Sequence, residues 1–257
     1  MFALTLALIV VVGVLLYNYL KYRARIKHTG LLGDWPVKPC SLDEVDPIFH
    51  TNEFGPTLDA QVKFVGRGNL VVPGGTSDTE AWILATLAKK SQHIFEFGTC
   101  TGKTTYLMAA NAPAGAKITT LTLEPSLLPE YKDESSDSKR AVRDALRESV
   151  FTTFMYSGTD VENKVTQLFM DSKNFDPTPY KGKMDLIFID GSHAYSYVLA
   201  DTEKAFEMVA PGGIILWHDY RGPFDTRDVY KALNKVASGK TLRNIKETSL
   251  VVYKQPA

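Results

Sequence analysis

The N-terminal residues 2–20 form a long, predominantly apolar run. Residues 2–20 carry no charged side chain, and only five of them dilute the apolar character: Thr5, Gly13, Tyr17, Asn18 and Tyr19. As a helix, this run would span roughly 28 Å, which is enough to cross the hydrocarbon core of a bilayer. We therefore expect residues 1–20 to form a transmembrane anchor.

Basic residues follow this run at once, and none precedes it. They are Lys21, Arg23, Arg25, Lys27 and His28. Positive charge accumulates on the cytoplasmic side of a membrane segment, whereas a cleaved signal peptide carries its charge before a shorter apolar run. The pattern predicts an uncleaved, single-pass membrane protein whose remaining residues lie in the cytoplasm, with the membrane as a partner of the N-terminal helix.

The rest of the chain mixes short apolar runs with segments of helical periodicity, which is typical of an α/β fold. Residues 29–73 carry scattered Gly and Pro and few periodic apolar runs. The predicted parts are thus an anchor at 1–20, a basic juxtamembrane segment and linker or cover at 21–73, and a catalytic domain at 74–257. Buried strands are expected before Gly98 and at 118–123, and helices at 76–88, 139–148, 161–170, 194–209 and 225–237.

Charge and cysteine content limit the kinds of partner that the chain can be expected to bind. The chain has 29 basic and 29 acidic residues, so it offers no general electrostatic attraction for nucleic acid. Its two cysteines, Cys40 and Cys100, lack the spacing of a metal site and predict no disulfide, in agreement with a reducing cytosol. A nucleic-acid substrate is therefore not expected, while a homodimer is left open.

A glycine turn joins a predicted strand to a helix. Gly98 and Gly102 allow a tight turn and a close backbone approach to a ligand, and Glu124 follows the next strand at the distance where a carboxylate grips a ribose diol. A dinucleotide fingerprint requires glycine where Cys100 stands, and an ATP phosphate loop requires one more residue between its glycines and a glycine in place of Phe97. S-adenosylmethionine is the third ligand that such a turn can hold.

The turn Glu96-Phe97-Gly98-x-x-x-Gly102 resembles the first motif of class I S-adenosylmethionine-dependent methyltransferases, and the resemblance runs from about residue 74 to the C-terminus. Residues 157–160, 184–190 and 212–219 are similar to the turn after strand three, to strand four and to strand five of that family, and residues 242–253 to its terminal hairpin. The chain is most similar to the small O-methyltransferases that act on catechols, sugars and natural products. The resemblance implies a doubly wound, mostly parallel, seven-stranded Rossmann-like sheet.

The same resemblance assigns cofactor contacts. Glu96 would lie under the methionine amine, Glu124 on the ribose hydroxyls, and the turn with Asp160 near the adenine. The residues expected to bind S-adenosylmethionine are Glu96, Gly98, Thr99, Gly102, Glu124, Thr159, Asp160 and Asp190.

Two acids and two histidines are candidates for the chemistry. Asp190 and Asp219 end adjacent predicted strands at the edge where α/β sheets place ligands, and their oxygens suit a divalent metal such as Mg²⁺. His193 is a candidate general base in the position where catechol-type relatives carry lysine. Those relatives have asparagine where Tyr220 stands, so His218 becomes the candidate third metal ligand. The expected catalytic residues are His193 and Asp190, and the expected metal ligands are Asp190, Asp219 and His218.

These observations predict a methyltransferase that moves a methyl group from S-adenosylmethionine to an oxygen of a small polar acceptor, assisted by a divalent metal. Two alternatives stay open. One is an ATP-dependent enzyme that uses residues 98–104 as a phosphate loop. The other is a membrane-tethered module that keeps the cofactor pocket without turnover, which the Tyr220 departure permits.

Overall fold

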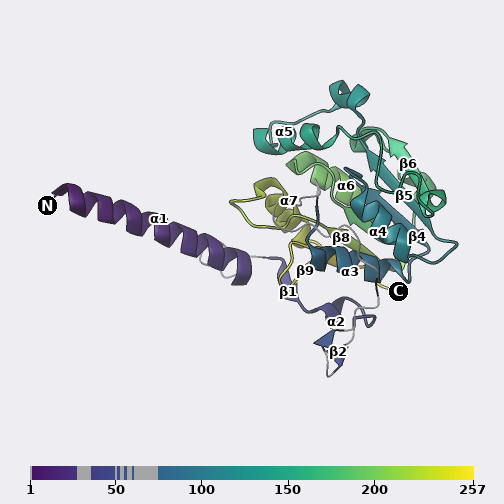
Figure 1. Ribbon diagram of the computed structural model, residues 1–257, viewed down its shortest axis with the longest axis horizontal. Coiled ribbons are helices and arrows are strands. Elements are labelled where there is room, and N and C mark those ends of the chain that lie inside the picture. Colours follow the sequence, from purple (N-terminus) through teal and green to yellow (C-terminus); the bar gives the residue numbers. More distant parts are fainter. Residues whose placement is uncertain (1, 28–35, 50, 53–54, 57–59, 61–74) are drawn as a thin grey trace.

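The computed structural model describes residues 2–27, 36–49, 51–52, 55–56, 60 and 75–257. Helix α1 (Phe2–Lys27) extends away from a domain that contains all the other described elements (Figure 1). Large apolar side chains of α1 from Leu6 to Tyr19 are 51% to 64% exposed, and Tyr17 packs edge-on against Phe224 of the domain. Among the described residues, no helix has the length and hydrophobicity needed to cross a membrane, so the predicted transmembrane helix is not confirmed.

The domain is built on one eight-stranded sheet. Its strand order is β1 (Lys38–Cys40), β9 (Arg243–Ile245), β10 (Val251–Lys254), β8 (Val209–Trp217), β7 (Met184–Ile189), β4 (His93–Phe97), β5 (Lys117–Thr122) and β6 (Val165–Phe169). Neighbouring strands are parallel except β10, which runs antiparallel to β8 and β9. A separate two-stranded pair is formed by β2 (Thr51–Asn52) and β3 (Gly55–Pro56). The Rossmann-like methyltransferase topology and the predicted terminal hairpin are confirmed.

Helices cover both faces of the sheet because the strands bury residues on both sides. The helices of the domain are α2 (Leu42–Val45), α3 (Asp78–Ala88), α4 (Lys103–Asn111), α5 (Lys139–Glu148), α6 (Tyr195–Met208) and α7 (Arg227–Ala237). Along β7, Leu186 and Phe188 pack into one hydrophobic core with α3 and α4, whereas Ile187 and Ile189 pack into a second core with α6 and α7. Short 3₁₀ turns are η1 (Pro125–Glu130), η2 (Glu162–Lys164), η3 (Ser172–Asn174) and η4 (Thr178–Tyr180). This burial on both faces explains why the strands are continuous apolar runs.

Two details of the predicted fold are wrong. The sheet has an eighth strand, because β1 pairs in parallel with β9 at the sheet edge. The helix predicted at 161–170 is instead η2 followed by strand β6, which pairs in parallel with β5. Apolar residues three and four apart suggested a helix there, but the backbone groups of this segment complete the edge of the sheet.

Part of the segment assigned from sequence to the linker or cover packs with the domain. Strand β1 joins the sheet, and its last residue Cys40, together with Val45 and Phe49, is buried in the core that contains α3 and α4. Residues 28–35 and 61–74 of that segment lie outside the described residues. The folded domain therefore includes residues 36–49 as well as those from position 75 onward.

Candidate active site

A crevice opens at the C-terminal ends of the four neighbouring strands β7, β4, β5 and β6. Helices α5 and α6 and residue Tyr131 contribute the remaining walls. Its lining residues are Phe97, Gly98, Cys100, Leu121, Thr122, Leu123, Tyr131, Ala145, Glu148, Ser149, Met170, Asp171, Ser172, Asp190, Gly191, Ser192, Tyr197 and Asp201. This is the edge at which open α/β sheets bind ligands.

The two glycines of the turn are required by the packing of the protein itself. Gly98 has a φ of 99°, and a Cβ at this position would lie 2.6 Å from the Cα of Gly191 and against the carbonyl of Asp190. Gly102 has a φ of 77° at the start of α4, where a Cβ would lie 2.9 Å from the Cβ of Phe154. Both positions exclude other residues because the backbone is left-handed and neighbouring segments approach closely.

Glu96 is fully buried behind the turn rather than among the crevice-lining residues. Its carboxylate accepts hydrogen bonds from the hydroxyls of Thr104, Thr105 and Thr120. Burial raises the pKa of Glu96 to about 7, although the threonine donors act in the opposite direction. The hydroxyl of Thr99 shares this network through a 2.7 Å contact with Thr120, so these two predicted cofactor ligands are held by protein groups.

The remaining predicted cofactor residues lie in different places. Glu124 follows β5, is partly exposed and accepts a hydrogen bond from Ser126. Thr159 and Asp160 precede β6 instead of following it, and neither lines the crevice. Thr159 donates a 2.6 Å hydrogen bond to the backbone of Tyr156, while Asp160 is exposed. The wrong helix prediction at 161–170 placed this turn at the opposite end of the strand.

Asp171 is a site residue that the sequence reasoning missed. It is the second residue after β6, lines the crevice and accepts a 2.8 Å hydrogen bond from the hydroxyl of Tyr197. Near it, Asp201 of α6 is buried, and its Oδ1 has no hydrogen-bond partner among the described residues. Burial raises the pKa of Asp201 to about 7. The available signal was the β-favouring run Val165–Phe169 followed by an acid, the same pattern as at Asp190.

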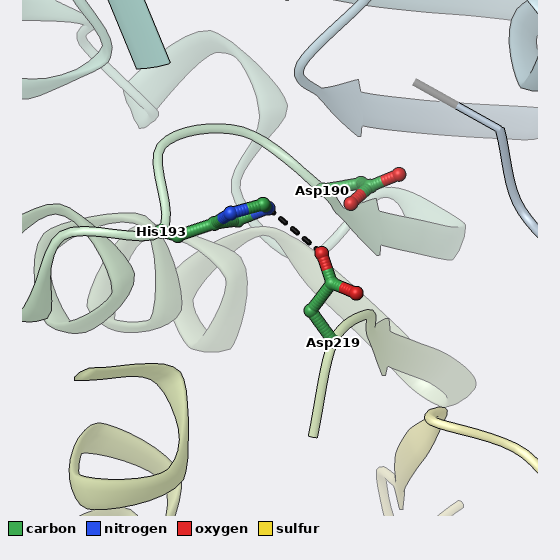
Figure 2. A group of neighbouring side chains, drawn as sticks. All are labelled: Asp190, His193 and Asp219. Carbon is green, nitrogen blue, oxygen red and sulfur yellow. Dashed lines mark ion pairs between the residues drawn. The ribbon is translucent and has the colours of Figure 1, made fainter. Parts of the chain in front are cut away.

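Asp190, His193 and Asp219 converge beside the crevice. One possible ligand atom from each lies within 4.8 Å of the others, and the Nε2 atom of His193 is 2.8 Å from the Oδ2 atom of Asp219 (Figure 2). Asp190 directly follows β7, Asp219 follows β8, and His193 lies on the loop between β7 and α6. Because β7 and β8 are adjacent parallel strands, the topology brings the two predicted acids together as expected.

The backbone of Asp219 is strained. Its φ is 62°, a left-handed conformation that costs an aspartate roughly 1–3 kcal/mol. The backbone N–H of Arg221 donates a 2.8 Å hydrogen bond to the Asp219 carbonyl, which also accepts from the Thr226 hydroxyl. The Arg221 guanidinium lies 2.6 Å from Oδ1 of Asp219. These contacts turn the carboxylate toward His193 and compensate its charge.

His218 is placed differently from the predicted metal ligand. Its Nδ1 is 2.9 Å from Asp190 Oδ1, and its Nε2 is 3.3 Å from Oε2 of Glu80, on α3. Both ring nitrogens therefore face carboxylates, and the three-residue cluster with metal-binding geometry contains His193 in its place.

The charges of the cluster shift the pKa values of its members. Burial opposes the charged form of His193, but the Asp219 carboxylate outweighs it and raises the pKa to about 9. For His218, burial is likewise outweighed by Asp190 and Asp219, which hold its pKa well above the ordinary range. Burial would raise the pKa of Asp219, yet the charges of His218 and His193 hold it well below its usual value. The cluster thus consists of ion pairs near neutral pH.

The geometry does not favour the ATP alternative. In a phosphate loop, the lysine after the second glycine reaches the phosphates. Here, Lys103 is buried, donates a 3.1 Å hydrogen bond to the backbone oxygen of Thr76, and is not among the residues that line the crevice.

Comparisons with known proteins agree with the fold. Residues 95–220 match a family model described as a methyltransferase domain, and no curated protein matches the chain. The SAH-bound methyltransferase PaMTH1 of Podospora anserina is 17% identical, with a TM-score of 0.52 over 74% of this chain and 84% of its own. The O-methyltransferase TomG of Streptomyces achromogenes, in complex with SAM, is 16% identical, with a TM-score of 0.48 over 70% of this chain and 82% of its own.

The family match covers the glycine turn, the crevice and the Asp190–His193–Asp219 cluster. Residues 95–220 form a methyltransferase domain, and the chain has the Rossmann-like fold of the class I S-adenosylmethionine-dependent methyltransferases.

The ion pair between His193 and Asp219 predicts a pH-dependent stability. The pKa of His193 is raised from its ordinary value of about 6.5 to about 9, so the folded state binds the proton more tightly than the unfolded state. The stabilisation is fully present below pH 6.5 and is lost as the pH rises through 9. Thermal unfolding should show a lower Tm for His193→Gln than for the wild type at pH 6 and a vanishing difference by pH 10.

The matched control is His93→Gln, because His93 is half exposed and its Nδ1 lies 3.9 Å from Asp185. This variant should track the wild type across the whole range. A Tm difference for His193→Gln that stays constant from pH 6 to pH 10 would show that the ion pair does not stabilise the fold.

Proposed function

We propose that this methyltransferase transfers its methyl group to a hydroxyl oxygen of a small polar acceptor, of the sugar or natural-product type. The observation that carries the proposal is the contact between His193 and Asp219 next to Asp190 at the crevice. A histidine paired with a carboxylate is a suitable base for a hydroxyl proton. The polar residues Glu148, Ser149 and Ser192 on the crevice wall support a polar acceptor.

The reaction would be an in-line displacement at the methyl carbon. The acceptor oxygen forms a bond to this carbon as the carbon–sulfur bond breaks, and the electron pair of that bond goes to sulfur, which leaves S-adenosylhomocysteine. The hydroxyl proton passes to His193, and the adjacent Asp219 stabilises the resulting imidazolium. Because the pKa of His193 is about 9, its neutral form is a strong base that becomes more abundant as the pH rises.

We include a divalent metal in the proposal because the donor set is chemically suitable. Asp190 and Asp219 supply hard carboxylate oxygens within reach of one another, as Mg²⁺ prefers. These two residues would hold the ion, which would lower the pKa of an acceptor hydroxyl. Arg221 and His218 already compensate the same carboxylates, so the ion would have to compete with internal cations.

The test uses the full chain in mild detergent with S-adenosylmethionine and a panel of sugars, phenols and polyhydroxylated natural products. Mass spectrometry should detect a methylated acceptor, with and without added Mg²⁺ after chelation. Asp190→Ala should lower turnover by about 100-fold or more, since it removes a group beside the reacting oxygen, while affinity for S-adenosylhomocysteine stays within a few-fold. Unchanged turnover in Asp190→Ala removes this residue from the mechanism, and equal rates with and without metal reject metal assistance.

We also propose a corrected adenine contact. The family resemblance assigns this contact to the turn after the third strand, and the third strand is β6, so the contact falls on Asp171 instead of Asp160. In calorimetry, Asp171→Asn should weaken S-adenosylhomocysteine binding by about 10-fold, the value of one lost hydrogen bond to a charged group. Asp160→Asn is the matched control and should bind like the wild type. The reverse ranking of the two variants would restore the original assignment.

Membrane attachment through the N-terminal helix, with the catalytic domain in the cytoplasm, remains a proposal. It is supported by the uncharged run of residues 2–20 and by the exposed apolar side chains of α1. Cell fractionation should recover the full chain with membranes after an alkaline wash and release it with detergent. Recovery in the soluble fraction would refute the proposal.

A further inference from the structure

Glu80 caps the start of α3 and also contacts residues outside that helix. It is the third residue of α3 and forms a capping box with Ser77, whose backbone N–H and hydroxyl donate to Glu80 Oε2 at 2.9 and 2.8 Å. Its other oxygen, Oε1, accepts hydrogen bonds of 2.7 Å from both the backbone N–H and the hydroxyl of Ser249. One carboxylate therefore ties the start of α3 to the loop before β10.

The same carboxylate reaches the active-site cluster through one imidazole. Oε2 of Glu80 lies 3.3 Å from Nε2 of His218, and Nδ1 of His218 lies 2.9 Å from Oδ1 of Asp190 and 3.4 Å from Oδ2 of Asp219. The ring is thus held at both edges. A continuous line of contacts runs from α3, on one face of the sheet, to the acid that lines the crevice.

Helix capping alone does not account for this arrangement. The chain has a second capping box, formed by Ser41 and Glu44 at the start of α2. Glu44 is exposed and pairs with Arg243, whereas Glu80 is 4% exposed. Burying a carboxylate is costly unless it is paired and fully hydrogen-bonded, and the partners of Glu80 are Ser77, Ser249 and His218. The exposed Glu44 shows that an acid can cap a helix without being buried. The burial of Glu80 is therefore associated with its contact to His218 and not with capping.

We propose that Glu80 is a positioning residue of the methyltransferase, which orients the Asp190 carboxylate at the crevice by holding the ring of His218 from the opposite edge. Glu80 does not touch the crevice itself and acts through His218. The catalytic consequence rests on the proposed function of Asp190, but the coupling between the three side chains is a property of the protein without ligands.

The test compares Glu80→Gln, His218→Gln and Asp190→Asn, alone and combined, in the full chain in mild detergent. With ¹⁵N-labelled histidine, the ring signals of His218, assigned by their loss in His218→Gln, should shift or broaden in Glu80→Gln without any ligand. Glu44→Gln is the matched control because it removes a capping-box acid of the same kind, and it should leave these signals in place. Unchanged His218 signals in Glu80→Gln overturn the proposal.

A double-mutant cycle then measures whether Glu80 reaches Asp190. The combined effect of Glu80→Gln and Asp190→Asn on the unfolding equilibrium constant should deviate from the product of the single effects by about 3-fold or more, as for residues in one network. The deviation should disappear when His218→Gln is present in all four proteins. A purely structural role predicts independent effects in both backgrounds, which would refute coupling through the ring.

Kinetics with an acceptor from the panel adds the functional readout. Glu80→Gln should lower kcat by about 10-fold, the usual effect of losing a group that orients a site residue, with KM for S-adenosylmethionine unchanged. A change confined to KM would contradict the positioning role. The proposed function and the proposed role of Glu80 are tested by different measurements. Absence of S-adenosylhomocysteine binding would reject the methyltransferase function, whereas the ¹⁵N signals of His218 and the double-mutant cycle test only the role of Glu80.

Discussion

The close approach of two parallel strands at Gly98 is the constraint on which the site depends. The backbone N–H of Gly98 donates to Leu121 of β5, and the N–H of Asp190 donates to Phe97 of β4, both at 2.8 Å. A side chain at position 98 would occupy the place of the Asp190 and Gly191 backbone. Because glycine at position 98 allows these backbone contacts, the C-terminal ends of β4, β5 and β7 lie side by side. The crevice and Asp190 lie at this shared edge of the sheet.

Buried charge is the second feature that organises the site. Three carboxylates, from Glu80, Asp190 and Asp219, surround His218, and Asp219 is also paired with His193 and Arg221. An unpaired buried charge is far more costly than a paired one, so each member restricts the position of the others. The strained backbone of Asp219 persists within this set of contacts. Electrostatic pairing therefore supports the same geometry that the chemistry requires.

Much of the fold could be predicted from local patterns. The helix expected at 139–148 is α5 with the same bounds, and those expected at 194–209 and 225–237 are α6 and α7 with slightly shorter ones. Periodicity failed at β6, where apolar residues at helical spacing belong to an edge strand that is only partly buried. It also failed at β1, whose three residues have little pattern of their own and gain their strand conformation by pairing with β9.

The candidate site shows the same division. Asp190, His193 and Asp219 could be selected from the sequence because strand ends and short loops place them by local rules. The partners of Glu96 could not be predicted, because only the packing of α4 against the sheet surrounds its carboxylate with threonine hydroxyls from two elements. The contact between Glu80 and His218, which are 138 positions apart, was equally invisible.

The sequence by itself determined the class of fold, the position of the glycine turn and the acids that end the central strands, because these follow from hydrophobic periodicity and from backbone conformations that only glycine adopts freely. The tertiary structure alone decided which polar side chains face the crevice and which are held inside the protein. That outcome depends on contacts between elements that are distant in the chain. A buried carboxylate must be paired or hydrogen-bonded, and no local sequence pattern indicates which residue is its partner.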